Sequence, residues 1–256
     1  MSLYKTNIKM FCFVIVLQSI VLFSKAQNLV QNPSFEQHTQ CPTAMGDINM
    51  CNNWNNASIN STCDYYSALN CSGDYAPPLI NIGMTFYQEP LSGYSFGGFI
   101  PYYGVPGGMP SYVEFIQGQF NAPLIAGEEY YVEFYINLAT HQKYAIHNVA
   151  ALITDTSGYI DYNNLSMYSP QILPLAGKIY EDTVNWERIS GYYMAHGGES
   201  YITIGNYTPY GQELKDSTND YLTAETYYFI DSVGVYEVTH WDIWNAGGDK
   251  IHKLRR

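Results

Sequence analysis

The feature that most constrains this chain is a series of short runs rich in Val, Ile, Tyr, Phe and Thr, divided by Gly, Pro, Asn and Asp. In residues 129–137 the even-numbered positions are Tyr, Val, Phe and Ile, while the odd-numbered positions are mostly polar or Tyr. A period of two places alternate side chains on opposite faces of a strand, and the apolar set faces the core. After residue 26 no long run has the period of a helix. The chain is therefore predicted to be all-β.

Eight strands are predicted from these runs: 29–36, 94–100, 113–120, 129–138, 147–154, 186–194, 201–206 and 227–238. Three long loops are expected between them, at 37–81, 101–111 and 207–226. Many short strands with turn-rich connections are typical of a β-sandwich or jelly roll. Long loops in such folds are usually functional or disordered.

The first 26 residues have the features of a signal peptide. Lys5 and Lys9 precede an apolar run over residues 10–23, and Ser24-Lys25-Ala26 offers small residues at a cleavage site. The run is too short for a convincing membrane span. We expect an exported, secreted or cell-surface chain with no membrane span after cleavage and one domain over residues 27–238. Residues 239–256 change character and are interpreted as a linker or the start of a following module.

Four cysteines remain after signal cleavage, all within one 31-residue stretch of the long first loop: Cys41, Cys51, Cys63 and Cys71. An even number of cysteines in an exported protein predicts two disulfides that staple this loop. Three pairings are open, and we favour the local pairs Cys41–Cys51 and Cys63–Cys71. Zinc binding is the alternative, but the Cys-x-x-Cys spacing typical of zinc sites is absent.

The charge of the chain excludes several classes of partner. Between residues 27 and 240 there are four basic residues against 21 Asp and Glu, a formal net charge of −17. Such a surface repels phosphate backbones and anionic lipid, so nucleic acid is excluded as a partner. The low charged fraction (13%) and the 26 tyrosines favour a neutral ligand, because the tyrosine ring has an apolar face and a hydroxyl.

Both ends of the domain resemble a known family. Residues 28–36, Asn-Leu-Val-Gln-Asn-Pro-Ser-Phe-Glu, are similar to the opening strand of the galactose-binding-like jelly rolls found in carbohydrate-binding modules. Residues 227–236, Tyr-Tyr-Phe-Ile-Asp-Ser-Val-Gly-Val-Tyr, resemble the closing strand of those domains. With residues 89–94 and 186–206, the pattern over 28–238 resembles exported bacterial surface proteins associated with gliding motility. In those proteins the domain precedes an OmpA-like, PKD-like or sorting segment.

This resemblance implies a structural Ca²⁺ where the first and last strands meet. It would place Glu36 beside Asp231, with a backbone carbonyl of Ser34 or Ser92 and with Glu89 completing the shell. Ca²⁺ takes six to eight oxygens, typically carboxylates and carbonyls. The residues agree, because Asp231 interrupts an apolar strand and a buried carboxylate needs a cation or several donors. The alternative is that both acids simply accept hydrogen bonds from backbone amides.

Ligand binding is expected at aromatic residues on loops or on an exposed sheet face. The candidates are Trp54, Tyr65, Tyr66, Tyr102, Tyr103 and Tyr144. A flat ring stacks on a sugar face without charge, which suits this composition. The alternative is cross-strand packing, which must account for most of the tyrosines. Trp186 is assigned to the core.

Signs of catalysis are weak. Residues 93–97 match G-x-S-x-G, but the Gly- and Pro-rich sequence that follows cannot form the helix of a nucleophile elbow. His141 and His147 have no metalloprotease spacing. Our leading hypothesis is a non-catalytic module that binds glycan at the cell surface. The second is a structural or adhesive surface protein that binds protein partners. The third is a glycoside-active enzyme, which needs two suitably spaced carboxylates.

Overall fold

The computed structural model describes residues 27–81, 85–104, 112–218, 225–238, 240–244 and 250–255, the last two ranges through their backbone. The expected signal peptide, residues 1–26, lies outside the described residues. Within the part of the chain that is described, no helix is both long and apolar enough to cross a membrane.

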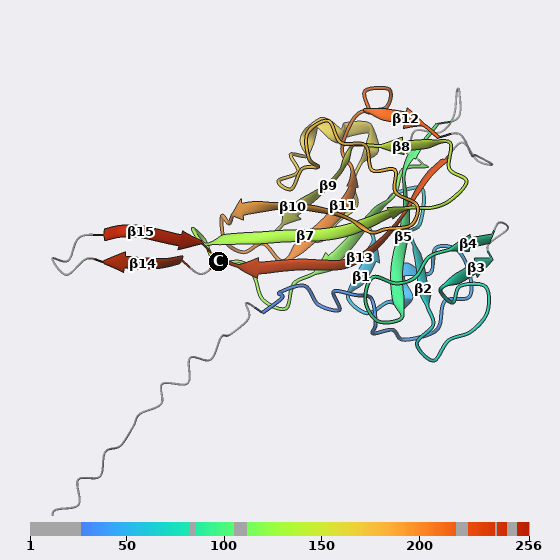
Figure 1. Cartoon of the computed structure of the whole chain (residues 1–256), viewed down its shortest axis with the longest axis horizontal. Helices are drawn as coiled ribbons and strands as arrows, with labels where there is room; N and C mark the ends of the chain where they lie inside the picture. Colours follow the sequence, from blue (N-terminus) through green and yellow to red (C-terminus); the bar gives the residue numbers. More distant parts are fainter. Residues whose placement is uncertain are drawn as a thin grey trace, which may run out of the picture.

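The chain folds into a β-sandwich of two antiparallel sheets (Figure 1). The four-stranded sheet has the order β1 (Trp54–Asn56), β6 (Phe115–Gln119), β11 (Tyr201–Asn206) and β9 (Val149–Thr154). The five-stranded sheet has the order β10 (Glu187–Met194), β7 (Glu129–Leu138), β13 (Glu225–Glu237), β5 (Ser95–Tyr103) and β2 (Asp64–Ser67). From β5 to β13 the long strands alternate between the two sheets, which is jelly-roll topology.

Smaller elements surround the sandwich. The pair β3 (Leu79–Asn81) and β4 (Thr85–Tyr87) and the pair β8 (Tyr144–Ile146) and β12 (Lys215–Ser217) lie at its periphery (Figure 1). The described residues include the short 3₁₀ helices η1 (Asp47–Met50) and η3 (Tyr162–Met167). In the tail, β14 (His240–Trp244) pairs with β15 (Lys250–Arg255) in a hairpin that projects from the end of β13 (Figure 1).

The predicted alternation in β7 is confirmed. Tyr130, Val132, Phe134 and Ile136 are buried in the main core between the sheets, while the intervening residues 131, 133 and 135 are only half-buried. Each fully buried side chain of this size contributes about 1.5–3 kcal/mol of transfer free energy. The strand β11 also has the predicted bounds, and the remaining long strands shift by one to three residues.

A second apolar cluster lies on the outer face of the five-stranded sheet. It joins Tyr66, Phe96 and Phe229 to side chains of the β3–β4 hairpin. Trp186 packs on the edge of this cluster, with its ring 5.8 Å from that of Phe96, and its indole N–H donates to the Glu89 carbonyl at 2.9 Å. Trp186 is therefore a half-buried packing residue of the outer face, not a residue of the main core.

The prediction of an opening strand at 29–36 is wrong beyond its first residues. Val30 forms a single bridge to Phe120, and the backbone then turns through Asn32 and Phe35, both with positive φ. The Asn32 side chain stabilises this turn, since its amide donates to the Gln37 carbonyl at 2.8 Å and its oxygen accepts from the Gln37 N–H at 2.9 Å. Asn tolerates the left-handed region better than most residues. The opening segment nevertheless lies beside the closing strand, as expected.

The expected loop 37–81 contains η1 and three strands, β1, β2 and β3. These strands are only three or four residues long, too short to show a reliable period in the sequence. The expected loop 101–111 begins with the last residues of β5, and its residues 105–111 lie outside the described part. The expected loop 207–226 contains β12, and β13 begins two residues before the predicted start.

The favoured disulfide pairing is wrong. Cys41 bonds to Cys71, while Cys51 and Cys63 are free thiols buried in the main core. The Cys51 sulfur accepts from the Asn32 amide at 3.2 Å, which ties it to the opening turn instead of to another sulfur. Burial raises the pKa of both free thiols well above its usual value. One bridge therefore staples the ends of the loop, and two cysteines act as small apolar residues.

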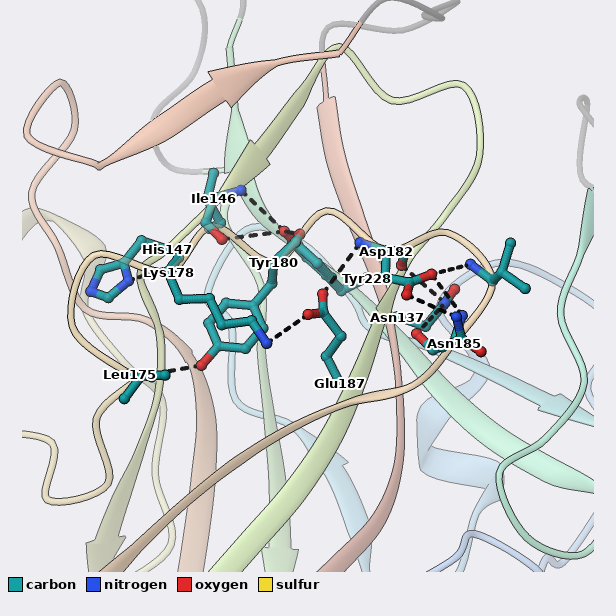
Figure 2. Close-up of polar contacts among 11 residues, drawn as sticks. Asn137, Ile146, His147, Leu175, Lys178, Tyr180, Asp182, Asn185, Glu187 and Tyr228 are labelled. Atoms are coloured by element: carbon teal, nitrogen blue, oxygen red, sulfur yellow. Dashed lines mark hydrogen bonds and ion pairs between the residues drawn. The ribbon is translucent and has the colours of Figure 1, made fainter.

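Polar contacts hold the connection between β9 and β10 against neighbouring strands of the sandwich (Figure 2). The Tyr228 hydroxyl accepts from the Ile146 N–H at 3.0 Å and donates to the Tyr180 carbonyl. Lys178 forms an ion pair with Glu187 at 2.8 Å. Farther along, Asp182 accepts from backbone amides of its own turn, as Figure 2 shows. A side-chain network therefore fixes the part of this connection that follows η3, residues 173–186, which forms no helix and no strand.

Candidate ligand-binding site

Two concavities of the described structure share part of their lining. We call the first the acidic pocket; it has a volume of about 280 Å³ and is lined by Asp64, Glu114, Tyr227 and seven other residues. We call the second the open groove; it has a volume of about 570 Å³ and includes Asn56, Asn60 and Tyr159. Thr62 and Tyr112 line both. The two concavities together are named the ligand groove.

The sheet register places the two central polar groups of the acidic pocket. In β2, Tyr65 points into the main core, so Asp64 and Tyr66 project from the outer face. Asp64 is paired with Gly98 of β5, and Gly98 is paired with Phe229 of β13. A Cβ at Gly98 would lie 2.0 Å from the Tyr227 hydroxyl oxygen. Glycine at this position therefore lets Tyr227 lie across β5 and reach Asp64.

Asp64 is almost completely buried and has three protein donors. Its Oδ2 accepts from the Tyr227 hydroxyl at 2.6 Å and from the Tyr66 hydroxyl at 3.3 Å, and its Oδ1 accepts from the Gly46 N–H at 2.5 Å. The two tyrosine hydroxyl oxygens are 2.9 Å apart. Burial raises the pKa of Asp64 in spite of these donors, because desolvation disfavours the charged form more than they favour it.

Glu114 is the second buried acid of the acidic pocket. Its Oε1 accepts from the Ser61 hydroxyl at 2.5 Å, and its Oε2 accepts from the Ile100 N–H at 2.7 Å. Burial raises the pKa of Glu114 well above its usual value, and the neighbouring Asp64 charge raises it further. Strongly perturbed acids in a concavity are a recognised mark of functional sites. Each carboxylate oxygen of this pair already accepts a bond from the protein.

Aromatic and amide side chains complete the ligand groove. Tyr112 is 39% exposed at the junction of its two parts, and Tyr159 is 67% exposed on the wall of the open groove. The lining as described contains no Lys, Arg or His. A groove with exposed tyrosine rings, amides, hydroxyls and buried acids suits a neutral ligand that carries many hydroxyls. Sequence reasoning missed Tyr112 and Tyr159, because single aromatics in turns carry no period.

Three of the predicted ligand-binding aromatics are core residues, so their assignment as stacking residues is wrong. Trp54, Tyr65 and Tyr66 are each at most 1% exposed. Trp54 stacks on Phe35 with ring centres 4.3 Å apart, and the Tyr65 hydroxyl donates to the Phe35 carbonyl at 2.9 Å. These rings have no free face for a sugar.

The other three predicted aromatics lie nearer the surface. Tyr102 is 4% exposed and packs edge-to-face on Tyr144 at 5.7 Å, below the Lys215 ammonium. Tyr144 is half-buried. Tyr103 is also half-buried, and its ring lies 5.3 Å from that of Tyr112, beside the ligand groove. Tyr103 is thus the one predicted aromatic in contact with the lining of this groove through a ring pair.

The structure brings together four of the five predicted calcium ligands. Asp231 is fully buried; its Oδ2 accepts from the Ser92 N–H at 3.0 Å, and the Ser92 hydroxyl donates to that of Ser34 at 2.8 Å. Glu36 accepts from the Tyr94 N–H at 2.8 Å. Burial raises the pKa of Asp231 to about 7, and the nearby Glu36 charge is a lesser cause. Glu89 instead accepts from the Tyr87 hydroxyl at 2.7 Å.

The remaining motifs do not form a catalytic site. Ser95 of the G-x-S-x-G match is fully buried in β5 and donates to the Ser67 hydroxyl at 2.8 Å. His147 contacts the Lys178 carbonyl at 2.7 Å (Figure 2). Near the disulfide, a ring nitrogen of His38 lies 3.6 Å from the Cys71 sulfur. This sulfur is bonded to the Cys41 sulfur, so neither sulfur is a thiolate that could bind a metal.

No family model matches the sequence, and no curated protein matches it. Among solved structures, the CBM22-1 xylan-binding domain of Xyn10C from Paenibacillus barcinonensis is 14% identical, with 83% of this chain and 95% of that one covered and a TM-score of 0.39. The K1 cleaved adhesin domain of Lys-gingipain from Porphyromonas gingivalis W83 is 13% identical, covers 82% and 97%, and has a TM-score of 0.40.

The carbohydrate-binding module TmCBM61, solved in complex with β-1,4-galactotriose, is also similar. It is 13% identical, covers 83% of this chain and 99% of its own, and has a TM-score of 0.33. Because every identity is below 25% and every TM-score below 0.5, we transfer no ligand and no site residue from these structures. The chain is similar in outline to carbohydrate-binding modules and adhesin domains with a β-sandwich fold.

Proposed function

We propose that this chain is a non-catalytic module that binds a neutral glycan in the ligand groove. The observation that carries this proposal is the acidic pocket, where Asp64, Glu114 and Tyr227 are held beside the exposed ring of Tyr112. A carboxylate oxygen has a second lone pair beside the one that a protein donor uses, so these acids can also accept from sugar hydroxyls, and tyrosine faces pack on the apolar face of a sugar ring. Both features work without a positive charge.

The proposal includes a cellular setting. The basic start, apolar run and small residues of segment 1–26 favour export, and the resemblance of residues 28–238 favours a surface protein of the kind associated with gliding motility. A secreted or surface-retained glycan-binding module is consistent with the acidic composition. Detection of the chain in the medium or in the surface fraction, with an N-terminus at Gln27, supports this setting, and retention in the cytoplasm contradicts it.

The proposal also includes a structural Ca²⁺ at the junction of the opening turn and β13. Glu36, Asp231 and the hydroxyls of Ser34 and Ser92 supply oxygen atoms of the type that Ca²⁺ prefers. A cation there would neutralise two neighbouring acids and hold the opening turn to the closing strand. A melting temperature that falls when EGTA is added, and recovers with excess Ca²⁺, supports this part. An unchanged melting temperature refutes it.

The binding proposal is tested with a glycan array on the chain from residue 27 onward, followed by calorimetric titration of the best oligosaccharide. Tyr112→Ala is the test variant, and Tyr210→Ala is its control, because Tyr210 is similarly exposed (43%) and also packs on one tyrosine, Tyr102. We expect the first variant to weaken binding at least about tenfold, equivalent to roughly 1.4 kcal/mol, and the second to leave it unchanged.

Two outcomes would refute the proposal. Binding to no glycan on the array, while the chain is folded, would favour the structural or adhesive hypothesis. Release of reducing ends from the bound glycan, abolished by Glu114→Gln, would establish a glycoside-active enzyme instead.

A further inference from the structure

A row of tyrosines crosses the outer face of the five-stranded sheet, away from the ligand groove. Tyr131 of β7 is paired with Tyr192 of β10 on one side and with Tyr236 of β13 on the other. Residues directly opposite in an antiparallel sheet project on the same face. These three tyrosines, which we call the aromatic row, therefore lie side by side on three adjacent strands, over roughly 10 Å.

The rings of the aromatic row are partly exposed on this face, and the planes of Tyr131 and Tyr192 are inclined to each other by 55°. A Cβ at Gly234 would lie 2.4 Å from a ring carbon of Tyr236, so this ring covers the backbone of Gly234 and lies along the sheet. The rings of Tyr131 and Tyr192 have centres 5.4 Å apart. Tyr192 is 54% exposed, and the other two are half-buried.

A pocket of about 410 Å³ adjoins this row. Tyr236, Tyr135 and Glu133 line it from the sheet, and Ser34 and Ser232 line it from the opening turn and the bulge of β13. The Glu133 carboxylate accepts from the Tyr131 hydroxyl at 3.1 Å, so the row and the pocket are connected. The feature is therefore an aromatic strip with a recess of mixed polar and apolar lining beside it.

The charges of this face favour a neutral ligand. Arg188 lies 3.5 Å from Glu133, so the basic and acidic groups of the strip compensate each other. The recess offers hydroxyl, amide and carboxylate groups beside two tyrosine rings, and its remaining apolar lining comes from Pro33, Leu91 and Val233. Tyrosine is also enriched at protein interfaces, so binding of a protein, a second copy of the chain included, is one outcome that the experiment must separate. Hydroxyl and carboxylate groups beside tyrosine rings, with the nearby charges compensated, suit a neutral polyhydroxylated chain.

We propose that the aromatic row and its recess are a second carbohydrate-binding surface, which holds a neutral polysaccharide chain laid across β10, β7 and β13. The ligand class rests on the proposed function, but the location is independent of the ligand groove. With two separate surfaces the module bridges two segments of polysaccharide. Two linked binding events raise the overall affinity for a polymer far above that of either event alone.

The test combines footprinting and sedimentation. Hydroxyl-radical footprinting of the chain from residue 27 onward is carried out with and without an array-selected soluble polysaccharide, so that no variant has to fold. We expect protection of Tyr131 and Tyr236 as well as Tyr112. Protection of Tyr112 alone overturns the second surface and leaves the proposed function standing. Protection of none of the three overturns both.

Sedimentation with insoluble cellulose, xylan and chitin compares three variants with the unmodified chain. Tyr236→Ala with Tyr192→Ala removes two rings of the aromatic row, Tyr112→Ala alters the ligand groove, and Tyr210→Ala is the control. We expect the row variant to lose at least about tenfold in affinity for the polysaccharide that is bound, within the range of avidity effects, and to keep its affinity for short oligosaccharides in the groove. An unchanged affinity for the polymer, or a change of oligomeric state in the row variant, overturns the proposal.

Discussion

Replacement of Tyr227 by Phe tests the physical basis of the acidic pocket. The variant removes one hydroxyl, which donates to Asp64 at 2.6 Å, and leaves the apolar ring in place. A hydrogen bond to a charged group contributes about 1.5–3 kcal/mol, whereas one between neutral groups contributes about 0.5–1.5 kcal/mol. The free energy of unfolding should therefore fall by about 1.5–3 kcal/mol where Asp64 is ionised and by about 0.5–1.5 kcal/mol where it is protonated.

The sign of the pH dependence follows from the pKa of Asp64. Its pKa in the folded chain is raised above that in the unfolded chain, so ionisation of this group lowers stability as pH rises through that window. Loss of a donor to the carboxylate raises the pKa further. The loss of stability in Tyr227→Phe should consequently be larger at pH 8 than at pH 4.

The assay is urea unfolding of both proteins at the two pH values, with Tyr228→Phe as the control. Tyr228 is also buried, but the hydrogen bonds of its hydroxyl go to backbone groups, namely the Ile146 N–H and the carbonyls of Ile146 and Tyr180 (Figure 2). Its loss of stability should be the same at both pH values. An equal loss at pH 4 and pH 8 in Tyr227→Phe would refute the role given to Asp64.

Three further predictions follow from the same structure. Cys41→Ser should lower the free energy of unfolding by about 3–4 kcal/mol, because the disulfide closes a separation of 30 residues, and equal stability would contradict the pairing. In the unmodified chain, thiol titration should show the two free thiols reacting only after denaturation. In EGTA, the contribution of Asp231 to stability should fall by up to about 4 kcal/mol as pH rises from 4 to 7, because burial raises the pKa of Asp231 to about 7. The free energy of unfolding should therefore fall less steeply with pH in Asp231→Asn than in the unmodified chain, and an unchanged slope would contradict this role of Asp231. Trp54→Ala should cost about 3–5 kcal/mol by urea unfolding, since the ring is buried; a small cost with lost glycan binding would restore its predicted role as a ligand residue.

The sequence predicted those elements whose pattern is long enough to be decisive. The strands β7 and β11 match their predicted bounds because six to ten residues of alternation leave one register that buries the apolar face. The two ends of the domain also meet as expected, since Leu29 donates to the Val235 carbonyl at 2.8 Å. The closing strand could be predicted because its sequence, residues 227–238, is rich in Tyr, Phe, Ile and Val.

The sequence did not predict features that depend on single side chains meeting across the fold. The opening turn depends on the hydrogen bonds of the Asn32 side chain, whereas the sequence around it has the pattern of a strand. The disulfide pairing depends on where η1 and β2 place each sulfur. The acidic pocket depends on Gly98, whose missing side chain lets Tyr227 reach Asp64 across a strand. None of these contacts leaves a period in the sequence.

A crystal structure of the chain with the oligosaccharide selected on the array would test directly whether glycan binds in the ligand groove. We predict a sugar ring against Tyr112, with hydroxyls bonded to polar groups of the acidic pocket. A well-ordered oligosaccharide bound elsewhere, with the ligand groove filled by solvent alone, would contradict it.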